Sequence, residues 1–436
     1  MSARNPEPLK SIMATSTATL ADCSSLEAPG MRRGFRLELP LSPASWASFL
    51  AGALTPFTLS IGGEMPVGEI VLMLVAGWAM LCLVFNHAWP GPLLQDKLTR
   101  SLLAAQFVAL CGYVFSDLYR GSSSNDIARG WSRMIFLAID IVAMAYLFGR
   151  SPGNLLVFLF GRCLGEAASA MILGPLFGDL WKFGFGTPLT ILLFWIAPIA
   201  GPVAAVVAAA AAGVLHFSLD YRSLGSLCMV AGTLTVLQVL PKRSRLWLAP
   251  LGAVVVGGAI VWTYGNTRVG NEGRGTRSDV ERSAMATAAV EAFEESPLIG
   301  HGSWFSNSNV YDNFALIRHD AARAAHVGGF PDRNEGSAGT AIHSQILVAL
   351  AEGGLFGGAF FFVYGASLAW TLYLTVFVDE WNRLTPLCTL LLLFALWNLF
   401  FSPFSGAHRV HIAMTCALML LLRTKPLNLV PGETEP

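Results

Sequence analysis

Residues 339–358 read GTAIHSQILVALAEGGLFGG and contain the change of environment that decides the fold. The stretch begins as a polar loop, passes one histidine, His343, and continues as an apolar helix broken by a glycine pair. A polar segment that leads into a long apolar helix is typical of a chain entering a membrane from water. This interpretation places His343 at the boundary between membrane and water.

The composition of the whole chain favours the same environment. Of its 436 residues, 54% are hydrophobic and 13% are charged, so a water-soluble domain would leave much apolar surface exposed. We predict an all-α, polytopic membrane protein with about twelve transmembrane helices. The expected spans are residues 44–62, 67–87, 101–117, 134–149, 153–174, 188–200, 202–218, 223–240, 246–264, 354–378, 384–403 and 409–423. The two runs between 188 and 218 are equally compatible with one broken or re-entrant element.

Basic residues in the short loops predict the orientation, because they favour the cytoplasmic side. They place both termini in the cytoplasm: Lys97, Arg100, Arg150, Lys242, Arg243, Arg245, Arg383, Arg423 and Lys425. The predicted parts are a disordered cytoplasmic tail (1–43), transmembrane helices about one to nine (44–264), a loop domain outside the cytoplasm (265–341), a re-entry helix with the last spans (342–423), and a cytoplasmic tail (424–436).

One short loop disagrees with this orientation. Arg120, Arg129 and Arg133 fall on the outer side, where the charge rule does not expect them. An anionic ligand is one explanation for their presence.

The segment 265–341 is too long for a simple connector and is the expected functional domain. Ser278, with Glu281 three residues later, predicts a helix N-cap, and Pro297 predicts the end of that helix. A second helix is expected at 311–326.

Several kinds of chemistry lack a sequence signal. The chain has no P-loop, no dinucleotide-binding glycine motif, no H-E-x-x-H and no G-x-S-x-G. Its cysteines and histidines lack the spacing of metal ligands, so we expect no cofactor. Basic and acidic residues number 28 each, which gives no reason to expect nucleic acid as a partner.

The candidate site residues are Arg222, Arg282 and His343, which share the outer membrane boundary in the predicted arrangement. A guanidinium offers a planar fork of donors that matches phosphate oxygens. Each residue also has an ordinary interpretation: an arginine at a span end often reaches to lipid phosphates, Arg282 can pair with neighbouring acids, and a histidine at a helix start often serves as a polar cap.

Within the spans, other ionisable residues have mainly structural interpretations. Arg162 and Glu166 are four residues apart, which predicts that they neutralise each other on one helix face. Asp117 and Asp140 are acids at or inside the membrane; a proton path is one interpretation, and a hydrogen-bonded structural role is favoured.

Three motifs together resemble the O-antigen ligase and O-antigen polymerase families. Arg282 followed by SAMATAAVEAFEESPLIGHG resembles an arginine before an amphipathic helix and then Pro-Leu-x-Gly-x-Gly. The stretch HSQILVALAEGGLFGG is similar to a His-Asn-x-x-Leu segment with Glu-x-Gly-x-x-Gly, and DYRSLGS is similar to a turn with arginine at the start of an earlier span. Ser344, Ala286 and Tyr221 depart from the residues usual in these motifs.

The resemblance implies a C-type membrane glycosyltransferase (GT-C-like) in the bacterial inner membrane, with its large loop in the periplasm. Its donor would be a saccharide linked to undecaprenyl diphosphate, and its acceptor a glycan or the lipid A core. Arg222 and Arg282 would stabilise the leaving diphosphate without a metal, and His343 would act as a general base or as a third phosphate donor. The motifs do not separate a polymerase from a ligase.

The alternative from another class is a transporter of about twelve spans for a small molecule or a lipid-linked glycan. A transporter typically shows two related halves and substrate groups near the middle of the membrane. In this chain the only large loop follows the ninth expected span, and the charges concentrate at the outer boundary, so the glycosyltransferase hypothesis is favoured.

Overall fold

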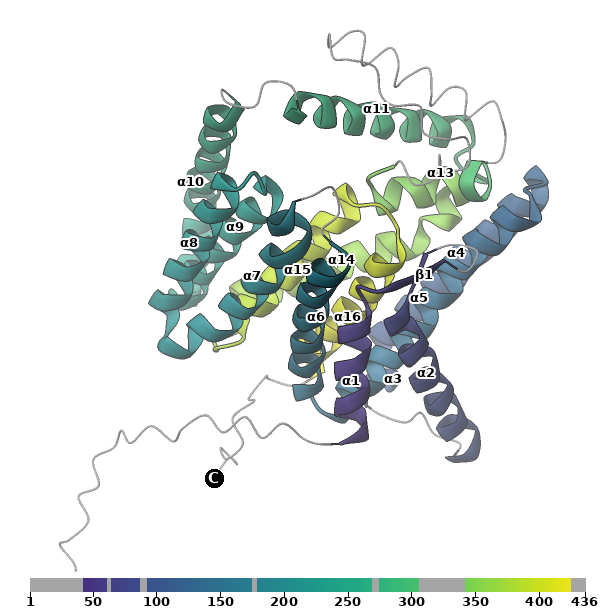
Figure 1. Ribbon diagram of the computed structural model, residues 1–436, viewed down its shortest axis with the longest axis horizontal. Helices are drawn as coiled ribbons and strands as arrows, with labels where there is room; N and C mark the ends of the chain where they lie inside the picture. The colour runs from purple at the N-terminus through teal and green to yellow at the C-terminus, as the bar shows by residue number, and fades with distance from the viewer. Residues whose placement is uncertain are drawn as a thin grey trace, which may run out of the picture. The chain divides into compact units, whose positions relative to one another are not determined.

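The computed structural model describes residues 42–60, 64–86, 92–174, 179–268, 274–305 and 342–424. These residues form a helical protein with one short β-hairpin (Figure 1). The first half comprises α1 (Pro43–Leu54), β1 (Thr58–Ser60), β2 (Glu64–Pro66), α2 (Val67–Asn86), α3 (Pro92–Gln95), α4 (Lys97–Arg120), α5 (Ser124–Arg150), α6 (Gly153–Ile172), the π-helical turn η2 (Trp181–Phe185), α7 (Gly186–Ile196) and the 3-10 turn η3 (Ala197–Ala200).

The second half continues the helical pattern. It comprises α8 (Pro202–Ser218), α9 (Arg222–Val239), α10 (Lys242–Arg268), α11 (Arg274–Glu295), the turn η4 (Ser303–Phe305), α13 (Gln345–Gly357), α14 (Ala359–Tyr373), the turn η6 (Leu374–Val378), α15 (Thr385–Phe401) and α16 (Gly406–Thr424).

Seven helical stretches among the described residues are long and apolar enough to cross a membrane. They are Val67–Phe85, Lys97–Arg120, Ser124–Arg150, Gly153–Ile172, Trp181–Ala200, Arg222–Val239 and Ala359–Val378; Pro202–Ser218, Gln345–Gly357 and Thr385–Phe401 are shorter apolar helices. Large apolar side chains such as Leu74, Trp78 and Phe85 on α2 are more than half exposed, as expected where lipid replaces water. The chain is therefore a helical membrane protein.

One expected span differs from the observed elements, and one open alternative is decided by them. The run at 44–62 is not one helix, because α1 ends at Leu54 and the strands β1 and β2 follow as an antiparallel pair. Pro56 explains the end of α1, since proline has no amide N–H and disfavours helix at the residue before it. The runs between 188 and 218 form two helices, because α7 and η3 end before Gly201 and α8 begins at Pro202.

The loop domain is described only in part. The helix α11 ends at Glu295, before Pro297 as predicted, but it begins at Arg274, so Ser278 lies inside the helix and the predicted cap is wrong. The helix expected at 311–326 lies outside the described residues.

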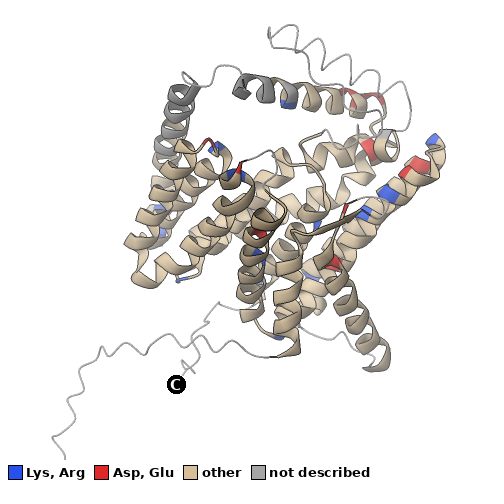
Figure 2. Cartoon of the chain, viewed as in Figure 1, with Lys and Arg blue, Asp and Glu red and all other residues tan. Residues whose placement is uncertain are grey.

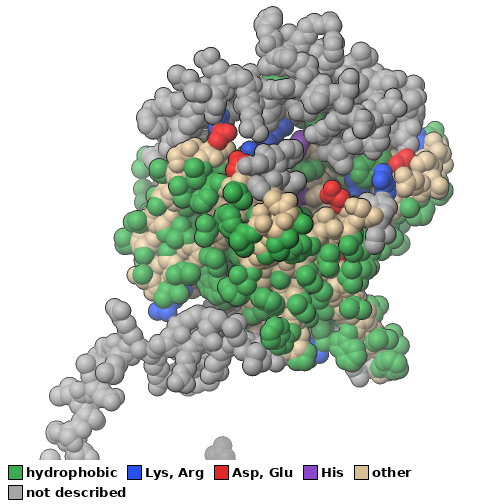
Figure 3. All heavy atoms as spheres, viewed as in Figure 1, with side chains coloured by type: hydrophobic (Ala, Val, Ile, Leu, Met, Phe, Trp, Pro, Cys, Tyr) green, Lys and Arg blue, Asp and Glu red, His purple; other side chains and the backbone are tan. Residues whose placement is uncertain are grey.

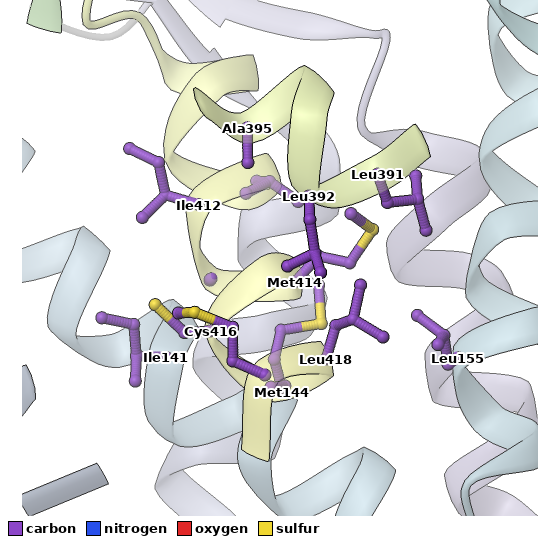
Figure 4. Close-up of a cluster of buried hydrophobic side chains, with 14 of the residues drawn as sticks. Ile141, Met144, Leu155, Leu391, Leu392, Ala395, Ile412, Met414, Cys416 and Leu418 are labelled. Atoms are coloured by element: carbon purple, nitrogen blue, oxygen red, sulfur yellow. The ribbon is translucent and has the colours of Figure 1, made fainter. Parts of the chain in front are cut away.

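The core lies where α5, α6, α15 and α16 meet. Figure 4 shows methionine, cysteine and branched aliphatic side chains of these helices in contact, among them Met144 on α5, Leu155 on α6, Leu391 on α15 and Met414 on α16. These side chains are almost completely buried. A second, smaller cluster joins α11 to the start of α13 through Ala289, Ala292, Ile342, Val348 and Ala351.

Charged side chains are unevenly distributed over the molecule. Figure 2 shows long stretches of α8 and α14 without charge, and Figure 3 shows a face whose lower part is covered mainly by hydrophobic side chains. On that face most of the charged and histidine side chains gather towards the end at which Figure 1 draws α11. The same end carries the sites described next.

Candidate functional site

His343 occupies the turn that leads into α13. Ile342 before it is buried against α11, and Ser344 after it caps the helix by accepting a hydrogen bond from the Leu347 amide at 3.4 Å. The cap explains why serine serves where the resembling families have asparagine, because both side chains can accept from a helix N-terminus. His343 itself is half-buried and lies within electrostatic reach of His408 on α16.

His408 belongs to a polar group between α6 and α16. Its Nδ1 lies 2.8 Å from the Ser405 hydroxyl, and its ring interacts electrostatically with Arg162 on α6. The Arg162 guanidinium lies 2.8 Å from Glu166 Oε1 through Nε and 3.3 Å from His411 Nδ1 through NH1. The predicted pair of Arg162 and Glu166 is thereby confirmed.

We call Arg162, Glu166, His343, His408 and His411 the histidine cluster. Its five members are one guanidinium, three imidazoles and a single carboxylate. Burial lowers the pKa of His408 to about 4, so this imidazole is neutral at pH 7 and can serve only as a neutral N–H donor or as an acceptor. His411 is 2% exposed, and its Nε2 has no hydrogen-bond partner among the described residues. Imidazole and guanidinium nitrogens with unused donor capacity are suited to an anion, above all to phosphate oxygens.

Arg222 is the first residue of α9, and the side chain of the preceding residue, Tyr221, interacts with the histidine cluster. The Arg222 Nε lies 2.9 Å from the Asp220 carboxylate. The neighbouring Tyr221 phenol lies 3.3 Å from the Thr187 hydroxyl and interacts electrostatically with Glu166 and Arg162. Burial raises the pKa of Tyr221, so this phenol stays protonated at neutral pH.

Arg282 lies apart from the other two predicted residues. It is exposed on α11, at the flank of the alanine-rich face that packs against the start of α13, because Ala289 of that face lies two helical turns further along. Among the described residues, no hydrogen bond or ion pair joins Arg282 to Arg222 or His343. The structure therefore groups His343 with Arg162 and His408, places Arg222 beside that group, and leaves Arg282 on the covering helix.

The motif Pro-Leu-x-Gly-x-Gly has a structural role that the sequence did not reveal. Residues 297–304 run along the glycine break of α13, where His301 and Gly302 donate backbone hydrogen bonds to Ala351 and Glu352, and Leu355 donates to Pro297. We call residues 297–304, together with Glu352–Gly354, the latch. It fastens the end of α11 to the spans.

Two glycines allow this close approach. Gly300 and Gly354 have φ values of +78° and +63°, a region that residues with a Cβ rarely adopt. A Cβ on Gly300 would lie 2.4 Å from the Glu352 carbonyl oxygen, and one on Gly354 would lie 2.4 Å from the Leu298 carbonyl oxygen. The glycines of both resembling motifs therefore serve the contact between the two segments.

Glu352 is the charged centre of the latch. It is fully buried and receives hydrogen bonds from Arg133 at 2.5 Å, the Tyr113 phenol at 2.8 Å and the Trp304 amide at 3.0 Å. The Trp304 ring covers the Arg133 guanidinium, whose central carbon lies 4.9 Å from the ring centroid. Arg133 thus pairs with a carboxylate 219 residues further along the chain.

Arg120 and Asp117 also form hydrogen bonds with the latch. Arg120 donates to the Gly300 carbonyl at 3.0 Å and to the Ser296 hydroxyl at 2.8 Å. Asp117 accepts from the Ser303 amide, the Ser303 hydroxyl and the Trp131 indole. These contacts account for two of the three arginines that disagreed with the charge rule, and they give Asp117 the structural role that was favoured for it.

Sequence reasoning missed His408, His411 and Glu352. The stretch HRVH at 408–411, with two histidines around an arginine at the start of an apolar run, was the available signal for the first two. Among the described residues, no three His, Cys, Asp or Glu side chains gather in a way that would hold a metal ion. Comparisons with protein-family models, curated proteins and solved structures find no match to this chain.

Proposed function

We propose that the protein is a membrane glycosyltransferase that transfers or polymerises saccharides carried on undecaprenyl diphosphate. The observation that carries this proposal is the histidine cluster, in which His408 interacts with Arg162 and with His343 at the start of α13, and Arg162 contacts His411. Such a group favours a ligand with several negative charges. A diphosphate on a lipid chain would bring that charge to the membrane boundary.

The reaction requires one bond to form as another breaks. An acceptor hydroxyl would attack the anomeric carbon of the donor saccharide, and the diphosphate oxygen would leave with the bonding electron pair. Arg162, Arg222 and Arg282 would stabilise the charge on the leaving diphosphate, a contribution of roughly 100- to 1,000-fold for one donor group. His343 would accept the hydroxyl proton, or would instead donate a third hydrogen bond to the phosphate.

Arg282 has a place in this proposal because of the helix that carries it. Since α11 is fastened at its end by the latch and packs on the start of α13, Arg282 is carried by a helix that lies next to the segment with His343, from which its guanidinium would reach towards a bound diphosphate. The donor would be used on the periplasmic side of a bacterial inner membrane, with both termini in the cytoplasm. The acceptor would be a glycan or the lipid A core.

The test uses the full-length protein in liposomes with an undecaprenyl-diphosphate-linked oligosaccharide and a glycan acceptor. Replacing His343 or Arg282 by alanine is expected to abolish transfer while the folded protein is recovered at the normal level. Arg243→Ala is the matched control, because Arg243 is exposed near the start of α10, far along the chain from the cluster. Full transfer by both His343→Ala and Arg282→Ala would refute the proposal.

A transporter is the second candidate, and one observation favours it. Glu69, Asp140 and Arg409 are almost fully buried, two of them within helices long enough to span a membrane, and intramembrane charges often mark transport pathways. The same liposomes distinguish the two functions. Movement of the lipid-linked oligosaccharide across the bilayer in the absence of an acceptor would support a transporter. Without an acceptor, a glycosyltransferase would leave this donor where it is and would not consume it.

A further inference from the structure

Three helices bring a second group of ionisable side chains together inside the bundle. Glu69 lies in the first turn of α2, Asp140 in the middle of α5, and Arg409 near the start of α16. The exposed fractions of Glu69 and Asp140 are 0%, and that of Arg409 is 4%. This group shares no residue with the histidine cluster, so the inference below does not depend on the proposed function.

Glu69 and Arg409 form a two-point ion pair. Arg409 donates through Nε to Glu69 Oε1 at 2.9 Å and through NH2 to Glu69 Oε2 at 2.8 Å. Both carboxylate oxygens therefore face the guanidinium, in the fork geometry that arginine and a carboxylate prefer. One positive and one negative charge are matched by this pair alone.

Asp140 is an additional acid beside this matched pair. Its carboxyl group faces that of Glu69 at hydrogen-bonding range, and Glu69 and Arg409 are the ionisable groups that act on it. No N–H or O–H donor of the described residues reaches either of its oxygens. A hydrogen bond between two carboxyl groups requires a proton on one of them, because two carboxylates offer only acceptors.

The surroundings also oppose a second negative charge. An ionised Asp140 would give the three side chains a net charge of minus one, far from water and beside a carboxylate of the same sign. Two carboxyl groups held this close share one proton in other proteins for the same reason. With the proton on Asp140 the group of three is neutral, and its helices meet without an uncompensated charge.

We propose that Glu69 and Asp140 form a proton-binding site: Asp140 is a neutral carboxylic acid that donates a hydrogen bond to Glu69, which stays ionised against Arg409. The ligand of this site is a single proton, held between α2 and α5. Among the described residues, Glu69, Asp140 and Arg409 are sufficient to explain the contact between the two carboxyl groups.

Infrared spectroscopy of the full-length protein in lipid nanodiscs at pH 7 tests the proposal. The C=O stretching band of an unionised carboxylic acid is expected in the wild type and should shift when aspartate labelled with ¹³C at its side-chain carboxyl is incorporated. Asp140→Asn should lose the band completely. Asp117→Asn should keep it, because Asp117 is equally buried but accepts hydrogen bonds from three donors. No such band in the wild type, or a band unchanged in Asp140→Asn, would overturn the proposal.

Thermal unfolding gives a second measurement that does not depend on the spectrum. The amide of Asp140→Asn can still donate to Glu69, so its melting temperature should stay near that of the wild type. Glu69→Gln removes the charge opposite Arg409 and should melt clearly lower. Equal losses in the two variants would mean that Asp140 is ionised and would reject the proposed site. The labelled wild-type spectrum remains decisive even if a variant cannot be purified.

Discussion

The latch and the histidine cluster lie at the same end of the molecule but use charge differently. In the latch, Arg133 meets Glu352 and the Trp304 ring, and Arg120 meets backbone and hydroxyl oxygens. In the histidine cluster, Glu166 is the only acid of the five members and pairs with Arg162, which also contacts His411 and interacts with His408. In the first arrangement the charge of Arg133 is matched by a carboxylate, although Arg133 Nε and Trp304 Nε1 have no hydrogen-bond partner among the described residues; in the second, His411 Nε2 has none.

This difference distinguishes arginines with a structural role from the arginine to which we assign a functional role in the proposal. A guanidinium whose partner is a buried carboxylate contributes to the fold, and its removal leaves a buried charge unpaired. A guanidinium that shares its only acid with several imidazoles contributes little to the fold and is available to an anion.

Removing the acid of the latch should have the largest effect. Glu352→Ala leaves the Arg133 guanidinium buried without its carboxylate, a change that costs about 3–5 kcal/mol in buried pairs. Thermal unfolding of the purified protein measures the loss. The control is Glu294→Ala, because Glu294 is exposed on α11; similar melting temperatures for the two variants would show that the latch pair is not structural.

A methyl group at the glycine break should have the next largest effect. Gly354→Ala places a Cβ 2.4 Å from the Leu298 carbonyl oxygen and requires a positive φ, which costs about 1–3 kcal/mol. We expect faster protease cleavage between α11 and α13 in this variant. Gly77→Ala is the matched control, since no atom lies within 4 Å of its added Cβ. An unchanged cleavage rate in Gly354→Ala would contradict the close contact.

The latch should also weaken in mild acid through His301. Its Nε2 lies 2.8 Å from the Ala292 carbonyl oxygen, and burial lowers its pKa below the ordinary value of 6.5. Below pH 6.5 the unfolded state therefore binds more protons than the folded state, so stability falls as the pH falls and is fully present above that pH. Melting curves between pH 7.5 and pH 5 should show less pH dependence in His301→Gln. An identical pH dependence would exclude His301 as the cause.

The histidine cluster should show the smallest change in stability. Arg162 and Glu166 have side-chain exposures of 12% and 20%, whereas Glu352 is fully buried, so Arg162→Gln should lower the free energy of unfolding by less than Glu352→Ala does. The same variant should lose glycan transfer in the liposome assay. A loss of stability as large as that of Glu352→Ala would remove the distinction between the two regions.

The sequence predicted the helices better than their contacts. The apolar run at 134–149 lies inside α5, and the four-residue spacing of Arg162 and Glu166 predicted their pair, because both features depend on local periodicity. The expected span at 44–62 was wrong because the prediction gave more weight to the hydrophobicity of this run than to Pro56, and α1 ends at Leu54. Local patterns gave no sign that Arg133 would meet Glu352, since tertiary packing alone joins residues so far apart.

The candidate site was predicted only in part for the same reason. His343 could be selected because its motif is contiguous, and it does lie beside other ionisable groups. Its neighbours His408 and Arg162 come from α16 and α6, and no spacing along the chain relates them to it. Arg222 and Arg282 were selected from their expected place at the outer membrane boundary and then from the resemblance, and their catalytic roles stay predictions.

The ion pair of Glu69 and Arg409 has a consequence for how the protein is made. The two residues are 340 positions apart, so at a synthesis rate of about 5–20 residues per second α2 exists for roughly 20–70 s before its partner helix is translated. Throughout that interval Glu69 lacks its guanidinium, and a neutral, protonated side chain would enter lipid at lower cost than a carboxylate. Insertion of α2 should therefore depend on an insertase or on neighbouring helices that shelter this acid until Arg409 has been translated.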